Sequence, residues 1–178
     1  MKAALVVILF AVSAFAQNQA EPNQPAEAAC GPATTHFDTR SASKQALVQP
    51  EAGKSQVYVI EVFDKVVGEI SRPTLRVGLD GAWMGAGKGN SYVTFPVDPG
   101  EHHLCTNWQS RLKRLSREAA FIAFTAEAGK NYYFRARITE HGGSSGASTF
   151  SLDLDPVDPD EGKYLVASSD FVVSHRKN

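Results

Sequence analysis

The chain has 178 residues, of which 43% are hydrophobic and 10% aromatic, and its formal net charge is −1. A chain of this length builds one domain with a tail, and its hydrophobic content is high enough for a packed core. A net charge this close to zero excludes a global attraction to nucleic acid or to an acidic membrane surface.

The first 16 residues have the features of a signal peptide. Lys2 supplies a positive start, residues 3–12 are apolar, and residues 14–16 (Ala-Phe-Ala) fit the pattern for cleavage before Gln17. The apolar run is shorter than the roughly 20 residues that span a bilayer, so we expect no transmembrane segment. We therefore predict an exported, soluble protein that is periplasmic or extracellular.

Residues 17–49 are predicted to form a flexible linker followed by an extended arm. The stretch up to residue 29 is rich in Gln, Asn, Glu, Pro and Ala and has no apolar period. The arm begins with Cys30, and the chain has one other cysteine, Cys105. In an oxidising compartment we expect these two cysteines to form a disulfide. The alternative is a lipid anchor on Cys30, but a lipoprotein needs its cysteine directly after the apolar run, and a polar stretch intervenes.

Residues 50–174 begin with patterns that are typical of strands and hairpins. Residues 56–63 are β-branched and aromatic, and we expect Tyr58, Ile60 and Val62 to face the core. The turn signal Asp80-Gly81 predicts a hairpin that joins residues 75–79 to a strand containing Trp83. Asp98-Pro99-Gly100 predicts a second hairpin, between residues 91–97 and 101–107. The glycine-rich residues 85–90 are expected to form a loop.

The second half of this domain alternates strands with turns. Strands are predicted at 119–125, 131–139 and 149–154, a short helix or basic loop at 108–118, and a Gly/Ser loop at 141–148. Asp158-Pro159 predicts the start of a short helix that runs to about residue 167, with Asp158 as its N-cap. Residues 171–174 follow as a last edge strand, and residues 175–178 as a polar tail. The whole pattern predicts an all-β fold, an antiparallel β-sandwich of about seven to nine strands with one short C-terminal helix.

Four motifs resemble a known family. They are Val-x-Leu-Asp-Gly-x-x-x-Gly at 77–85, Val-x-Pro-Gly-Glu-His at 97–102, Glu-Ala-Gly-Lys-x-Tyr-Tyr-x-Arg at 127–135, and Asp-Glu-Gly-Lys at 160–163. In this order they resemble the bacterial envelope family called domain of unknown function 2846, over about residues 54 to 166, and the turns also resemble PEGA-type surface domains. The resemblance implies a small exported β-sandwich, often a lipoprotein, and it carries over no catalytic residues. This chain departs from the family because it lacks a lipobox and has the Cys30 arm.

Three groups of residues suggest bound phosphate or metal, but each has a simpler explanation. The glycine-rich stretch 85–90 fits neither the Walker nor the dinucleotide pattern, and no helix is predicted after it. His103 and Cys105 would share a strand face, but two ligands do not make a closed zinc site. Five acids could bind calcium, although turns and N-capping account for three of them: Asp153, Asp155, Asp158, Asp160 and Glu161. We expect no metal and no cofactor.

Two groups of side chains could bind a ligand. Trp83, Tyr92 and Trp108 could form an aromatic platform for a sugar or a peptide, although core packing explains such aromatics more often. Arg111 and Arg114 lie in a basic segment that could contact an acidic glycan, although a solvated surface is the commoner explanation.

The sequence therefore predicts a non-enzymatic exported β-sandwich that binds an envelope protein or has a structural role in the cell envelope. A carbohydrate- or anion-binding module is the alternative. A hydrolase or metalloenzyme is the third hypothesis, and no Ser, His and acid pattern for nucleophilic catalysis supports it.

Overall fold

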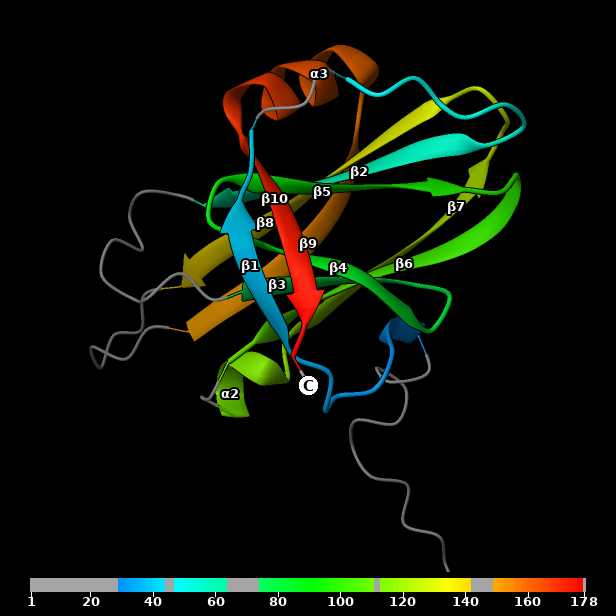
Figure 1. Ribbon diagram of the computed structural model, residues 1–178. Coiled ribbons are helices and arrows are strands. Elements are labelled where there is room, and N and C mark those ends of the chain that lie inside the picture. Colours follow the sequence, from blue (N-terminus) through cyan, green and yellow to red (C-terminus); the bar gives the residue numbers. More distant parts are fainter. Residues whose placement is uncertain (1–28, 44–46, 64–73, 111–112, 142–148, 178) are drawn as a thin grey trace, which may run out of the picture.

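The computed structural model describes residues 29–43, 47–63, 74–110, 113–141 and 149–177. In these residues, ten strands form two sheets that pack face to face (Figure 1). The predicted signal peptide, most of the predicted linker and the predicted Gly/Ser loop after His141 lie outside the described residues.

The larger sheet has six strands, and the smaller sheet has four. The order in the larger sheet is β1 (Phe37–Ser41), β10 (Asp170–Arg176), β5 (Ser91–Val97), β2 (Ser55–Phe63), β8 (Asn131–His141) and β9 (Thr149–Val157). The order in the smaller sheet is β4 (Ala82–Lys88), β3 (Thr74–Leu79), β6 (Gly100–Gln109) and β7 (Ala119–Ala126). Neighbouring strands are antiparallel except for β2 with β8 and β5 with β10, which are parallel. The predicted β-sandwich is therefore confirmed.

Two helices are described, α2 (Lys113–Ser116) and α3 (Pro159–Ser168). The side chain of Asp158 caps α3, because its Oδ1 accepts hydrogen bonds from the main-chain nitrogens of Asp160 at 2.9 Å and Glu161 at 3.1 Å. Pro159 is the first helical residue, where its missing N–H costs nothing. The predicted start of the C-terminal helix is thus confirmed.

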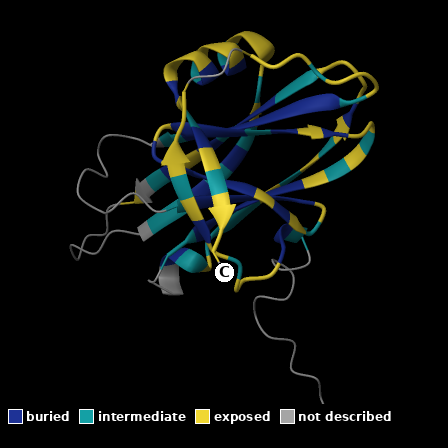
Figure 2. Cartoon of the chain, viewed as in Figure 1, coloured by how far each residue is buried: buried dark blue, intermediate teal, exposed yellow. Residues whose placement is uncertain are grey.

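The main core lies between the two sheets, where buried residues line the strands (Figure 2). Val57 and Val59 of β2 and Phe134 of β8 pack there with Leu104 and Trp108 of β6. The expectation that Tyr58, Ile60 and Val62 face this core is wrong. Those side chains lie on the other face of β2, in a second cluster beneath α3. Because both faces of β2 are covered, an apolar face does not identify the face that points between the two sheets.

The two predicted hairpins have different outcomes. Asp80-Gly81 joins β3 to β4 as predicted, with φ of 51° and 80° at these residues, the left-handed conformation that two-residue hairpins require. The second prediction is wrong. Strands β5 and β6 flank Asp98-Pro99-Gly100, but β5 pairs with β2 and β10, whereas β6 pairs with β3 and β7. This turn therefore carries the chain from one sheet to the other.

The predicted glycine-rich loop is mostly strand. β4 continues to Lys88, and its glycines face the opposite sheet. A Cβ at Gly85 would lie 3.1 Å from the Val93 side chain, and one at Gly87 would lie 2.9 Å from Ser91 Oγ. Glycine therefore lets β4 approach β5 closely, which is a packing role and not a loop signal.

The two ends of the domain pair with each other. Residues 37–41 of the predicted arm form β1, which lies beside β10. Since β10 also pairs with β5, the prediction that residues 171–174 form an edge strand is wrong. Pairing between the two ends of a chain depends on contacts distant in sequence, which local patterns do not reveal.

Candidate functional site

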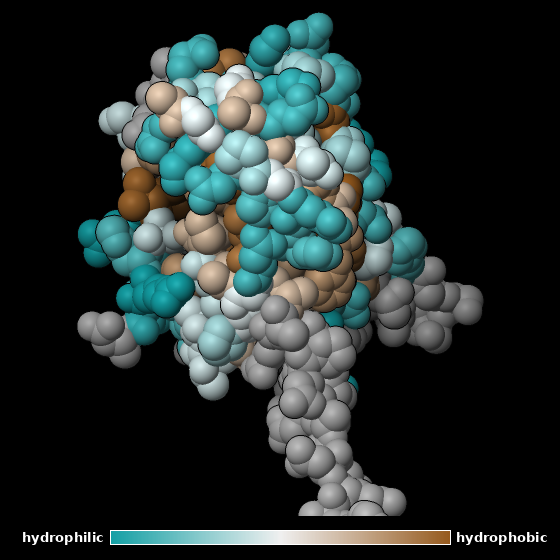
Figure 3. All heavy atoms as spheres, turned by 90° about the vertical axis from the view of Figure 1, so that its right-hand side faces the viewer, coloured by the Kyte–Doolittle hydropathy of each residue, from teal (hydrophilic) through white to brown (hydrophobic). Residues whose placement is uncertain are grey.

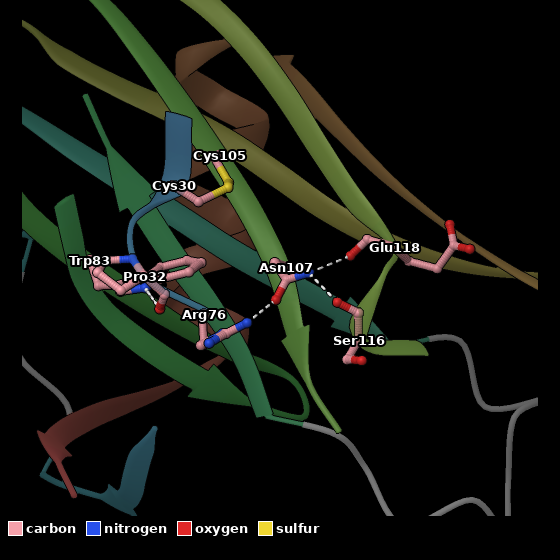
Figure 4. The surroundings of a disulfide bond; sticks show 8 residues. All are labelled: Cys30, Pro32, Arg76, Trp83, Cys105, Asn107, Ser116 and Glu118. Atoms are coloured by element: carbon pink, nitrogen blue, oxygen red, sulfur yellow. Dashed lines mark hydrogen bonds between the residues drawn. A yellow bond between two sulfur atoms is a disulfide. The ribbon is translucent and has the colours of Figure 1, made fainter. Parts of the chain in front are cut away.

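The outer face of the smaller sheet is covered over β3, β4 and β6 and is open over β7. Residues 29–37, which we call the strap, lie over β3 and its neighbours and lead into β1. The Cys30–Cys105 disulfide joins the strap to β6, with a Cα–Cα distance of 5.4 Å (Figure 4). The nitrogen of Gly81 donates to the carbonyl oxygen of Ala29 at 2.9 Å. The predicted disulfide is therefore present, and it uses the sulfur that a lipid anchor would need.

The strap lies against β3 because one residue there has no side chain. A Cβ at Gly78 would collide with the carbonyl oxygen of Cys30 and would lie 2.9 Å from its Cα. Within the strap, Gly31 has a φ of 120°, and a Cβ there would lie 2.8 Å from the Trp83 ring. Both positions therefore require glycine.

A buried arginine holds the middle of the strap. Arg76 is 4% exposed, and its Nη1 donates to the carbonyl oxygens of Ala33 at 3.0 Å and Thr35 at 2.8 Å. Its Nη2 donates to Asn107 Oδ1 (Figure 4). The guanidinium carbon lies 4.4 Å from the centre of the Trp83 ring, a cation–π contact. Burial lowers the pKa of Arg76 from its ordinary value.

The neighbouring donors also bond to main-chain carbonyls. Trp83 Nε1 donates to the carbonyl oxygen of Pro32 at 2.9 Å. Asn107 Nδ2 donates to the carbonyl oxygens of Ser116 and Glu118, both at 2.9 Å, and so fixes α2 and the start of β7 (Figure 4). The strap is therefore bound through its backbone, one disulfide and the buried ring of Phe37, which packs in one cluster with Trp83.

β7 forms the uncovered part of this face. Its sequence, AAFIAFTA, contains no charged residue, and it is one of the two edge strands of the smaller sheet. Phe121 is 51% exposed, and Ala123 and Thr125 on the same side are exposed as well. Phe121 is opposite Cys105 in the pairing of β7 with β6, so the two residues share the outer face of the sheet. Ile122 and Phe124 point the other way and pack on the core.

The other described edges are protected. β9 carries Asp153, Asp155 and Pro156, which disfavour pairing with another strand. β4 is flanked by β10, since Ser174 Oγ accepts from the nitrogen of Ala86 at 3.0 Å. β1 (FDTRS) is polar beyond Phe37. In the part of the chain that the structure describes, β7 is thus the edge strand without charge or proline, although part of it lies close to β9 of the larger sheet without pairing with it.

A histidine joins the two turns near the start of the strap. His102 Nδ1 lies 2.7 Å from Asp80 Oδ2, and its Nε2 lies 2.8 Å from the carbonyl oxygen of Asp98. Asp80 Oδ1 also accepts from the nitrogen of His103 at 2.8 Å. Because both ring nitrogens face acceptors, the charged imidazolium is the form that satisfies both.

The surroundings of His102 favour that charged form. Burial alone lowers the pKa of His102, but the hydrogen bonds and negative charges of Asp80 and Asp98 outweigh burial, so this pKa lies above its ordinary value. For Asp80, burial raises the pKa, and the bonds from His103 and His102 outweigh it, so the pKa is lowered. His102 therefore serves as a link between turns. Among the described residues, no three His, Cys, Asp or Glu side chains group as metal ligands.

The aromatic residues expected to form a platform are not brought together. Trp108 lies in the core between the sheets, Trp83 lies under the strap, and Tyr92 packs beneath α3. All three are at most 5% exposed, because each fills a different hydrophobic cluster. Arg111 lies outside the described residues, and Arg114 lies in α2 with its side chain outside them.

The acids considered for calcium have separate partners. Asp155 Oδ2 lies 3.5 Å from Arg137, Glu161 Oε1 lies 2.5 Å from Arg135, and Asp160 Oδ1 lies 3.2 Å from Lys163. Together with the capping role of Asp158, these pairs place the acids along β9 and α3 in structural contacts.

Two features of the site were missed from the sequence. Arg76 alternates with core residues, as a solvent-facing residue would, and only Trp83 on the hairpin partner hints that this face is covered. The edge position of β7 depends on which strands pair, which its own residues do not encode. The lack of charged residues in β7 is the sequence signal that could have pointed to this edge.

Comparison with known proteins gives one match. No curated protein matches the chain. No described helix is long and apolar enough to cross a membrane. The family described as protein of unknown function (DUF2846) matches residues 51–148, which is more than half of the chain. The match contains β2 to β8 and leaves out the strap, α3 and β10. The chain thus belongs to the DUF2846 family.

Proposed function

We propose that this protein is a non-catalytic, exported binding protein of the bacterial cell envelope, and that it recognises a partner protein by adding a strand to β7. The observation that supports this proposal is the open edge of β7, which is uncharged and carries the half-exposed ring of Phe121. Unprotected edges of this kind template pairing with another chain.

The chemistry of the edge defines the partner. The N–H and C=O groups of β7 that point away from β6 have no strand partner among the described residues, and they can pair with an extended segment, whatever its sequence. Side-chain preference comes from the exposed row of Phe121, Ala123 and Thr125, which favours apolar or small residues at alternate positions. A charge opposite Phe121 would lose solvation without gaining a partner. The partner segment is therefore extended, uncharged and partly apolar.

The cellular location rests on three observations. The leader-like residues 1–16 predict export. The Cys30–Cys105 disulfide suits an oxidising compartment, in which such bonds form and persist. The family resemblance implies an envelope protein, and we extend that role to this chain.

Site-specific photocrosslinking in intact cells tests the proposal. A photoreactive phenylalanine analogue replaces Phe121 in one strain and Tyr164 in another, because Tyr164 is an aromatic residue that is 70% exposed on the distant helix α3. We expect a protein adduct from position 121 and none from 164. Ala123→Lys should abolish the adduct at 121, whereas Ala123→Thr, which keeps the edge neutral, should retain it. Equal adducts at both positions, or none at 121, would overturn the proposal.

A further inference from the structure

We propose that the strand added to β7 is β7 of a second copy of this chain, so that two four-stranded sheets join into one continuous sheet across a two-fold axis. This inference rests on the proposed function and names the partner for the same edge. Two-fold dimers bury the same patch on both subunits, so the patch must be complementary to itself.

The shape of β7 is self-complementary in one register. Side chains on one face of β7 have odd numbers, and those on the other face have even numbers. Two residues that are opposite each other in a continuous antiparallel sheet lie on the same face, so in a pairing of two β7 strands both must be odd-numbered or both even-numbered. With the two-fold axis at Ile122, Phe121 lies opposite Ala123 of the partner subunit. In the same register Ala119 lies opposite Thr125 of the partner subunit, and Ile122 meets Ile122 of the partner subunit. The large exposed ring is therefore matched with a small residue, and apolar residues meet on the core side.

The charges that flank β7 favour antiparallel pairing. Arg117 precedes the strand and Glu127 follows it, and both side chains are exposed. Antiparallel pairing of two copies brings the start of one β7 to the end of the other, and so brings Arg117 near Glu127 of the partner subunit. Glu127 already lies 2.7 Å from Lys130 of its own chain, so the added arginine would complete a three-charge cluster at each end.

The strap does not cover β7, and β9 of the larger sheet lies close to part of β7 without hydrogen-bonding to it as a strand. The strap lies over β3, β4 and β6, and β4 is the opposite edge of the sheet from β7. Figure 3 views the side of the molecule toward which β6 and β7 extend in Figure 1, and apolar residues show there between hydrophilic ones.

Sedimentation of the disulfide-bonded chain over a range of concentrations tests the dimer. We expect a monomer–dimer equilibrium, and Ala123→Lys should raise the dimer dissociation constant by about tenfold or more, whereas Ala123→Thr should not. Circular dichroism confirms that both variants fold. A dimer that is insensitive to Ala123→Lys would use another surface and would overturn the inference.

A charge exchange tests the antiparallel arrangement. Arg117→Glu and Glu127→Arg should each weaken the dimer, because like charges would then face each other, and the double variant should restore it. Lys163→Glu on α3 is the matched control and should have no effect. A monomer at all concentrations whose position 121 crosslinks to a different protein overturns the dimer but supports the proposed function. A monomer without any such adduct overturns both.

Discussion

Each sheet of the sandwich has a covered outer face, but the two covers are held differently. On the larger sheet, α3 packs on tyrosines, with the rings of Tyr58 and Tyr133 stacked at 5.1 Å and Val166 buried among them. On the smaller sheet, the strap contributes backbone carbonyls, the buried ring of Phe37 and one disulfide. The helix is therefore held without a covalent link, whereas the strap has one. The two covers should therefore respond to different perturbations.

Removing the disulfide should have the largest effect, and it should be greatest in the strap. The disulfide closes a loop with a sequence separation of 75 residues, so the double variant Cys30→Ser, Cys105→Ser should lose about 4 kcal/mol of unfolding free energy. Urea denaturation measures this loss. Hydrogen exchange should rise more in residues 29–37 than in α3. Equal loss of protection in both covers would contradict the distinction between them.

Adding one methyl group should disturb the other cover. A Cβ at Gly162 would overlap the Tyr133 ring, so Gly162→Ala should destabilise the protein by about 2–3 kcal/mol. In an unobstructed helix the same change stabilises by up to about 1 kcal/mol, so the sign of the effect is diagnostic. Thermal unfolding measures it, and Lys163→Ala at the next, exposed position should be nearly neutral. A stabilised Gly162→Ala variant would show that α3 does not pack tightly on Tyr133.

These two covers also show what the sequence can predict. Asp158, Pro159 and the Asp80-Gly81 turn act on residues within a few positions, and their structures were predicted correctly. The strap, the edge position of β7 and the crossing of the chain at Asp98 depend on partners far along the chain. Glu61 misled the assignment of the β2 faces, because a charged residue indicates a solvent-facing side and this one is 1% exposed.

Removing the buried guanidinium should loosen the strap with the disulfide intact. Arg76→Met leaves the carbonyl oxygens of Ala33 and Thr35 and the Asn107 amide without their donor, and we expect a loss of about 2 kcal/mol. The matched control is Arg137→Met, which breaks an exposed pair with Asp155 and should cost less than about 0.5 kcal/mol. Chemical denaturation compares the two variants. Equal effects would mean that the strap does not depend on Arg76.

The smallest effect should come from pH, and it too should act at the strap. His102 links Asp80 to Asp98 at the turn whose Gly81 nitrogen bonds to Ala29. The folded-state pKa of His102 is raised, so its stabilisation is fully present below its unfolded pKa of about 6.5 and is lost as pH rises through the folded value. Above that value a neutral imidazole can donate to only one of its two acceptors.

The lowered pKa of Asp80 sets the lower pH limit of this link. The contribution of Asp80 to folding stability is present above its unfolded pKa and is lost as pH falls through its folded pKa. The link is therefore strongest in mildly acidic solution. There His102→Gln should lose about 1 kcal/mol relative to the unsubstituted protein, and the difference should shrink above neutral pH. Asp80→Asn removes the charge that favours the imidazolium and should flatten the same pH profile. If the His102→Gln difference stayed constant from pH 5.5 to 8.5, the histidine would be a packing residue, and the strap would not respond to pH.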